Sequence, residues 1–128
     1  MIVADSDVLI DFLRGREPGM TSVRSEISTG RLATTAVNCF ELLSGAQTRA
    51  QLSKVSDLLA ALIVLPVDEE AGMQAAEVRR KLEEKGEGIG MADYLIAGVC
   101  LCHQATLLTR NLEHFSRVPA LKVIDPAG

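Results

Sequence analysis

Short apolar runs alternate with longer amphipathic stretches along the whole chain. The apolar runs predict five short strands, at residues 1–4, 32–35, 63–65, 106–108 and 122–124. Apolar residues at helical spacing predict helices over residues 7–14, 18–29, 37–45, 48–62, 68–85 and 91–104, with a helical turn near Asn111. Because strands and helices alternate without an internal repeat or a linker, we expect an α/β fold. Its predicted architecture is a three-layer α/β/α sandwich with a mostly parallel sheet.

Capping residues mark the ends of the predicted helices. Asp7 is expected to cap the first helix, and Gly15 is expected to end it. Thr35 and Gly45 have the same roles for the helix over residues 37–45. These signals support the boundaries taken from the hydrophobic pattern.

Composition narrows the class of protein. The chain has 128 residues, of which 48% are hydrophobic and 23% charged, so we expect one folded domain over residues 1–128 and no disordered chain. No apolar run approaches the roughly 18 residues of a membrane span, and the apolar N-terminus has no basic segment typical of a signal peptide. The three cysteines are an odd number within apolar patterns, which favours reduced thiols and a cytoplasmic protein.

Three carboxylates occupy apolar surroundings. Asp5 directly follows the apolar run Ile2–Ala4, Glu41 lies in a helix with apolar neighbours, and Asp93 is the only charge between residues 89 and 101. Each also has an ordinary structural interpretation: a helix cap, a solvent-facing glutamate, and a first-turn acid stabilised by the helix dipole. Taken singly, none of the three decides between structure and function.

Together the three acids predict a cation site. Asp5, Glu41 and Asp93 each follow a predicted strand or open a helix that follows one, so all can reach the carboxyl edge of a parallel sheet. Carboxylates that share a crevice repel one another unless they are protonated or hold a cation. Oxygen ligands alone suit Mg²⁺ or Mn²⁺. Thr109 and Asn111, which follow the strand at residues 106–108, add polar groups at the same edge.

Four segments carry motifs in a recognisable order and spacing. They are residues 1–15 (MIVADSDVLIDFLRG), 37–45 (VNCFELLSG), 89–97 (IGMADYLIA) and 108–123 (LTRNLEHFSRVPALKV). The first three resemble the three acidic motifs of PIN-domain proteins of the VapC toxin family, and the fourth is similar to the C-terminal motif of that family. The resemblance spans almost the whole chain.

This resemblance implies a magnesium-dependent endoribonuclease, the toxin of a toxin–antitoxin pair. It assigns Asp5, Glu41 and Asp93 to the metal site, where Mn²⁺ is expected to substitute for Mg²⁺. Asn111 stands where many PIN domains have a fourth acid, so the site carries one charge less. Thr109 and Ser6 match polar positions that orient carboxylates or water. Metal-activated water would hydrolyse RNA to a 5′-phosphate and a 3′-hydroxyl.

The resemblance also implies two protein partners, a VapB-like antitoxin and a second copy of the chain in a homodimer. The apolar residues of the first two helices would supply a groove for an amphipathic antitoxin peptide; they are Leu9, Phe12, Leu13, Val23 and Ile27. Simple burial is the alternative for each of them. No membrane partner is expected.

The basic residues beside the motifs have two interpretations, and His114 has one. Thirteen basic and seventeen acidic residues give a net charge of −4, which predicts weak non-specific affinity for RNA. Arg14, Arg16 and Arg110 stand beside motif residues and are candidates for phosphate contacts, or else solvated charges at helix ends. We interpret His114 as a helix-end or surface residue.

Two alternatives remain open from the sequence. Asp5 and Asp7 fit the Asp-x-Asp opening of a haloacid-dehalogenase-like phosphatase, which would also need a lysine and a later acidic pair. Lys81 and Lys85 lie on a charged helix face, and Asp93 has no acidic neighbour. The second alternative is a non-catalytic PIN-like module that binds RNA or an antitoxin, and the amide at Asn111 is its support.

Overall fold

The computed structural model describes residues 1–128. The strands are β1 (Ile2–Ala4), β2 (Ala33–Thr35), β3 (Ile63–Leu65), β4 (Thr106–Leu108) and β5 (Lys122–Ile124). The helices are α1 (Ser6–Arg14), α2 (Gly19–Ile27), α3 (Ala36–Gly45), α4 (Arg49–Ala60), α5 (Glu69–Glu84), α6 (Met91–Cys102) and α7 (Leu112–Phe115). Every predicted element is confirmed, with boundaries that move by at most two residues.

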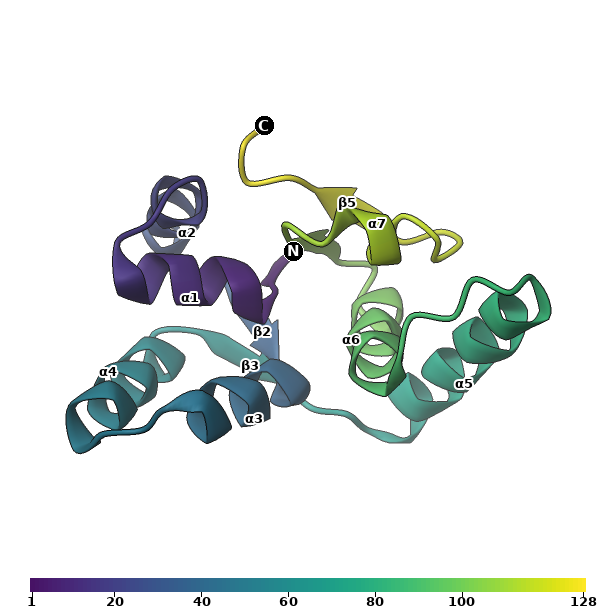
Figure 1. Ribbon diagram of the computed structural model, residues 1–128, viewed down its shortest axis with the longest axis horizontal. Coiled ribbons are helices and arrows are strands. Elements are labelled where there is room, and N and C mark those ends of the chain that lie inside the picture. The colour runs from purple at the N-terminus through teal and green to yellow at the C-terminus, as the bar shows by residue number, and fades with distance from the viewer.

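All five strands run parallel in one sheet, in the order β3-β2-β1-β4-β5 (Figure 1). The central strand is β1, whose Val3 pairs with Ala33 of β2 on one side and with Leu107 of β4 on the other. The carboxyl ends of β1, β2 and β4 therefore lie next to one another at one edge of the sheet. Parallel α/β sheets bind ligands at this edge.

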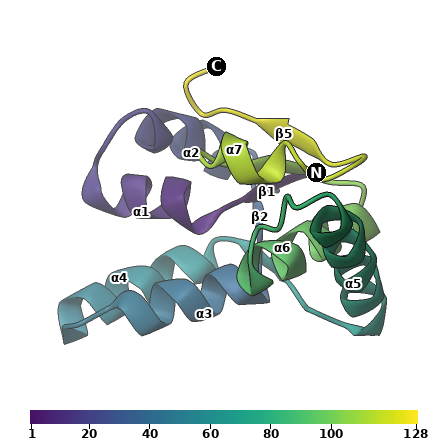
Figure 2. The ribbon, with the colours of Figure 1, turned by 45° about the vertical axis from the view of Figure 1, so that its right-hand side comes forward.

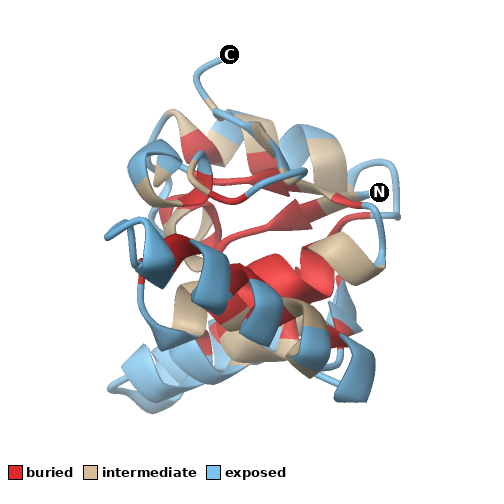
Figure 3. Ribbon diagram, turned by 90° about the vertical axis from the view of Figure 1, so that its right-hand side faces the viewer, coloured by how far each residue is buried: buried red, intermediate tan, exposed pale blue.

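Helices cover both faces of the sheet, as predicted, because successive strand residues point to opposite sides. Val3 and Leu107 belong to an apolar core formed with α5 and α6, whereas Ala4 and Leu108 belong to a second core formed with α1 to α4. Figure 2 shows α3 and α4 side by side, with α5 and α6 forming a separate pair. The buried residues follow the strands and the inner faces of the helices (Figure 3).

The α5–α6 pair is packed closely enough to require a glycine. A Cβ atom on Gly98 of α6 would lie 2.9 Å from the Cβ of Ala75 and would collide with the carbonyl oxygen of Ala71. Small residues on both helices therefore bring α6 close to α5. This packing fixes the N-terminal turn of α6, which carries Asp93.

The prediction that Asp7 caps α1 is wrong. Asp5 is the N-cap: its backbone is extended, and its Oδ1 accepts a hydrogen bond of 2.8 Å from the backbone N–H of Ser6. The physical reason is the one-residue connection between β1 and α1, which leaves Asp5 as the only residue outside both elements. Thr35 caps α3 as predicted, and Gly15 ends α1 with φ near 65°, a conformation that favours glycine.

Cys39, Cys100 and Cys102 are free thiols, and Cys100 is buried in the core. None of the helices combines the length and the apolar character needed to cross a membrane.

Candidate active site

Asp5 lies at the end of the central strand and is held by donors from three elements. Its Oδ1 accepts hydrogen bonds from the Ser6 backbone and from Asn38 Nδ2 of α3, at 2.8 and 3.0 Å. Its Oδ2 accepts a hydrogen bond of 2.7 Å from Thr109 Oγ1, directly after β4. Only 8% of the residue is exposed. These contacts fix the carboxylate at the carboxyl edge of the sheet.

Burial makes the charge on Asp5 costly. The pKa of Asp5 is raised from 3.8 to about 6, first by burial and then by the nearby charge of Asp7, and the three hydrogen bonds only partly oppose this shift. Burial also raises the pKa of Asp7, although contacts with Arg110 lower it. A bound cation would relieve both effects, so the electrostatics of this edge favour a cation.

Asp7 shares Thr109 as a neighbour with Asp5, and one of its carboxylate oxygens has no hydrogen-bond partner. Its Oδ2 accepts a hydrogen bond of 3.0 Å from the backbone N–H of Arg110, and Thr109 Oγ1 lies 3.3 Å from the same oxygen. Its Oδ1 is buried without a hydrogen-bond partner. An unpaired buried acceptor is rare in proteins and marks a polar position that a further donor or cation would satisfy.

Glu41 reaches Asp5 through Ser6 and Asn38. The Ser6 hydroxyl donates to Glu41 Oε1 at 2.8 Å and accepts from Asn38 Nδ2 at 2.9 Å, and that same amide group donates to Asp5. Glu41 is exposed to solvent on α3, which agrees with its interpretation as a solvent-facing glutamate. Its contact with Ser6 nevertheless joins it to the site.

Asp93 joins the network from the other side, through the segment that follows β4. The Thr109 hydroxyl accepts a hydrogen bond of 3.0 Å from the Asn111 backbone N–H, and Asn111 Oδ1 accepts one of 3.4 Å from the backbone of His114. His114 Nδ1 lies 2.9 Å from Asp93 Oδ2. The structure therefore brings all five predicted site residues into one continuous network; they are Asp5, Glu41, Asp93, Thr109 and Asn111.

Continuity of the network is not the same as direct coordination. In the side-chain arrangement of this structure, no group of three or more His, Cys, Asp or Glu side chains is close enough together to hold one ion. The donor chemistry of the predicted ligands nevertheless fits a hard cation, because all are carboxylate oxygens and Asp5 is buried beside a second acid.

Sequence reasoning missed two residues of this network. Asn38 is fully buried, and it bridges Asp5, Ser6 and the cap residue Thr35. His114 lies in the last turn of α7, as the helix-end interpretation predicts, but its contact with Asp93, 2.9 Å from Nδ1 to Oδ2, was not predicted. The available signals were the Thr-x-x-Asn capping pattern for Asn38 and the Asn-x-x-His spacing within the C-terminal motif for His114.

We expect Asn38→Ala to lower the free energy of unfolding by about 2–4 kcal/mol, because it leaves buried donors and acceptors without partners. Urea unfolding followed by circular dichroism measures this loss. Asn38→Asp should be no better, since it keeps the oxygen that accepts from Thr35 but places a new charge against Asp5. Ser44→Ala, exposed on the same helix, is the control. An Asn38→Ala protein as stable as wild type would contradict this role.

The Arg110 side chain is half-exposed, and it also contacts another part of the protein. Its Nε lies 3.1 Å from Oδ2 of Asp11, a buried residue one helical turn after Asp7 on α1. The Arg110 backbone also donates to Asp7, so this residue fastens the segment after β4 to α1. The ion pair gives Arg110 a structural role beside the predicted phosphate contact.

Arg110→Ala is expected to lower the free energy of unfolding by about 1–3 kcal/mol, because it leaves the Asp11 carboxylate buried without a counter-charge; half-exposure of Arg110 limits the loss. The same substitution in an Asp11→Asn background should cost less. Denaturant unfolding of the four proteins gives this coupling, and Arg16→Ala is the exposed control. Full stability of Arg110→Ala would leave only the phosphate role.

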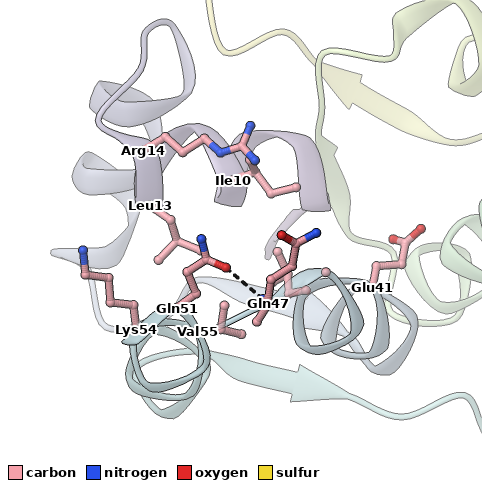
Figure 4. Close-up of a pocket in the computed structure, with 11 residues that line it drawn as sticks. Ile10, Leu13, Arg14, Glu41, Gln47, Gln51, Lys54 and Val55 are labelled. Carbon is pink, nitrogen blue, oxygen red and sulfur yellow. Dashed lines mark hydrogen bonds between the residues drawn. The ribbon is translucent and has the colours of Figure 1, made fainter. Parts of the chain in front are cut away.

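A cavity of about 420 Å³ opens beside Glu41, between α1, α3 and α4. Figure 4 shows Ile10, Leu13 and Arg14 of α1 facing Lys54 of α4 across it. Its walls combine apolar, basic and amide side chains, and Glu41 of the acidic site lies at one end. Gln51 Oε1 accepts a hydrogen bond of 2.8 Å from the backbone of Gln47 on its floor.

The predicted apolar groove over α1 and α2 needs a correction. Leu9 and Val23 are fully buried in the core beneath the helices and are not available to a peptide. Phe12, Leu13 and Ile27 are partly buried against the same core. The reason is that α1 packs against α2 and the sheet with its apolar face, which leaves only the margin of that face in the cavity.

Comparison with known proteins agrees with this architecture. A PIN domain family model matches residues 2–121. Ribonuclease VapC10 of Mycobacterium tuberculosis is 36% identical over 122 residues, which cover 95% of this chain and 91% of the relative. The chain therefore belongs to the PIN-domain family. Within that family it is similar to VapC ribonucleases, including the tRNA(fMet)-specific endonuclease VapC of Salmonella typhimurium, which is 28% identical over 106 residues and 80% of each protein.

Solved structures agree on the fold. DNA-bound VapBC from Salmonella typhimurium gives a TM-score of 0.86 at 25% identity and covers 98% of this chain and 97% of that one. VapBC2 from Rickettsia felis, bound to a promoter DNA fragment, gives a TM-score of 0.87 at 24% identity and covers 98% of both chains.

The phosphatase alternative has no support in the structure. Lys81 is exposed on α5 and pairs with Glu77, 3.2 Å away on the same helix. Asp7, the required general acid, is half-buried and bonded to the Arg110 backbone. The match to the PIN domain family replaces this interpretation.

Proposed function

We propose that this protein is a VapC-type endoribonuclease, the toxin of a toxin–antitoxin pair. The observation that carries the proposal is the single hydrogen-bonded network at the carboxyl edge of the sheet. It joins the acids of three family-like motifs, Asp5, Glu41 and Asp93, which are far apart in sequence. Relatives named ribonucleases support RNA as the substrate class.

Nucleases of this family generally depend on a divalent metal ion. We infer that the ion here is Mg²⁺, with Mn²⁺ as a substitute, and that Asp5, Glu41 and Asp93 hold it through carboxylate oxygens. When bound, the ion would supply activated water and charge stabilisation for hydrolysis of an RNA phosphodiester. This reaction leaves a 5′-phosphate and a 3′-hydroxyl.

The remaining residues prepare the site. Thr109 holds one oxygen of Asp5 and Asn38 holds the other, so the carboxylate is oriented before substrate arrives. Ser6 keeps Glu41 close to Asp5. Asn111 connects Thr109 to the helix that carries His114. Fixing charged groups in advance removes a reorganisation cost from the reaction.

The partners follow from the relatives and from the surface. Solved VapBC structures support a VapB-like antitoxin as partner of this chain. The cavity between α1, α3 and α4, with apolar walls near Arg14 and Lys54, would accept an amphipathic antitoxin segment that ends near the acidic site. We further propose a homodimer, a cytoplasmic location consistent with three free thiols, and a single domain over residues 1–128, which the single sheet supports.

Expression of the chain alone, and together with the product of the neighbouring reading frame, tests the function. We expect growth arrest from the chain alone, relief on co-expression, and recovery of both proteins in one complex. The purified chain should cleave RNA with Mg²⁺ or Mn²⁺ and not in EDTA, leaving 5′-phosphates that a 5′-phosphate-dependent exonuclease recognises. A stable complex without metal-dependent cleavage would instead support the non-catalytic binding module.

A further inference from the structure

The imidazole of His114 makes the one hydrogen bond of the Asp93 side chain. The Nδ1 atom lies 2.9 Å from Asp93 Oδ2, and 22% of the Asp93 side chain is exposed. Asp5, by contrast, accepts hydrogen bonds from three donors. Asp93 stands in the first turn of α6, whose N-cap Gly90 has no side chain to order that turn. The orientation of the Asp93 carboxylate therefore depends on His114.

His114 is itself held in place from two sides. Asn111 is the N-cap of α7, and its Oδ1 accepts the backbone N–H of His114 at 3.4 Å. The Asn111 backbone donates to Thr109, which in turn donates to Asp5. The next residue, Phe115, is fully buried in the core. The short helix α7 thus has a fixed place relative to Asp5.

We propose that His114 is a positioning residue, which donates its Nδ1 hydrogen to Asp93 and holds that carboxylate toward the metal site, and that Asn111 acts by placing His114. This inference rests on the proposed function, because it takes Asp93 to be a metal ligand. A ligating carboxylate that is held by a hydrogen bond needs less reorganisation on binding the ion, and partners of this kind typically change metal affinity about 10- to 100-fold.

The proposal explains why an amide suffices at position 111. A helix cap needs a short side chain with an oxygen that accepts a backbone N–H, and Asn and Asp meet this need about equally. In this structure the Asn111 oxygen has that use. The fourth acidic position of the family pattern then serves the placement of His114, and its lost charge leaves the three proposed ligands unchanged.

Three substitutions of His114 separate hydrogen bonding from shape. The side-chain nitrogen of Asn stands close to the place of Nδ1, whereas that of Gln reaches the place of Nε2. We therefore expect His114→Asn to keep Mn²⁺ affinity within about threefold of wild type. His114→Gln and His114→Ala should lose roughly 10- to 100-fold. Isothermal calorimetry with Mn²⁺ on the full chain without RNA measures this affinity, and His103→Asn, exposed at the end of α6, is the control.

Nitrogen-15 NMR of the metal-free protein gives a readout that does not depend on the ion. The spectrum of His114 should show the hydrogen on Nδ1, and this signature should disappear in Asp93→Asn if the carboxylate selects the tautomer. Urea unfolding of each variant checks that it folds.

The failures are distinguishable. If wild type binds Mn²⁺ but Asp93→Asn binds it equally well, Asp93 is not a ligand, and both this inference and that part of the proposed site fall. If Asp93→Asn loses affinity while the folded Asn, Gln and Ala variants of His114 all bind like wild type, only the role of His114 is overturned. Equal losses in the Asn and Gln variants would also contradict it, because they would show a requirement for the ring itself.

Discussion

Replacing Asp5 with Asn is expected to lower RNA cleavage by about 10³-fold, the largest effect of any single substitution. The change removes a proposed metal ligand at the centre of the network, and metal-ion stabilisation of phosphoryl charge contributes several kcal/mol, at about 1.4 kcal/mol for each factor of ten. The new amide still accepts hydrogen bonds from Ser6 and Asn38 and donates to Thr109, so the fold should persist. Initial rates on a defined RNA with Mg²⁺ measure the loss.

Two controls make this result specific. Asp57→Asn removes an equal charge from the exposed face of α4 and should leave the rate unchanged. Capture of the antitoxin by Asp5→Asn should also match wild type, which separates the loss of chemistry from a loss of structure. Cleavage by Asp5→Asn at the wild-type rate would show that Asp5 does not hold the ion.

Stability of the metal-free protein is expected to fall as the pH rises from 4 to 7. The pKa of Asp5 is about 6 in the folded protein and 3.8 as its ordinary value, so between these values the folded state binds more protons than the unfolded state. The contribution of Asp5 to the free energy of unfolding is therefore fully present below pH 3.8. It is lost as the pH rises past 6, and the total loss is about 3 kcal/mol. Denaturant unfolding in EDTA across this range measures the slope.

The contribution of Asp5 is isolated by comparison with Asp5→Asn. This variant cannot ionise at position 5, so it should be more stable than wild type at pH 7 by up to about 3 kcal/mol, with little difference at pH 4. Addition of Mg²⁺ or Mn²⁺ at pH 7 should restore the lost free energy of unfolding to the wild-type protein. The same addition should have less effect on Asp5→Asn. Identical pH profiles for the two proteins would contradict a costly charge at Asp5.

The two predictions have one physical origin. β1 is the central strand, and its one-residue connection to α1 leaves Asp5 buried at the end of that strand. A carboxylate in this place destabilises the metal-free protein and is well placed to bind a cation. Such a balance is typical of functional sites, where stability is lost to keep a charged group ready.

The local sequence was sufficient to predict the helices and strands. The residues that cap α3 and end α1 could be identified because these roles depend on one side chain and a few neighbours. The cap of α1 was misassigned because Asp5 and Asp7 are both good caps, and the choice depends on how tightly β1 joins α1. The length of the connection between β1 and α1 is a property of the packed sheet.

Candidate acids were found for a different reason. Asp5 and Asp93 stand out because charged residues are rare in apolar segments, which is visible in sequence without any knowledge of packing. Asn38 did not stand out, because a buried amide on an apolar helix looks like an ordinary turn or surface residue until its partners are known. His114 was missed likewise, since its partner Asp93 lies 21 residues away.

By itself, the sequence determined the order of strands and helices, the α/β class, and the acids from which a site can be built. It could do so because hydrophobic periodicity and charge are properties of short segments. Only the tertiary structure decided that β1 is central, that Arg110 pairs with Asp11, and that Asn38 and His114 orient the acids. Those relations join residues between 21 and 104 positions apart, and they exist only once the helices have packed on both faces of the sheet.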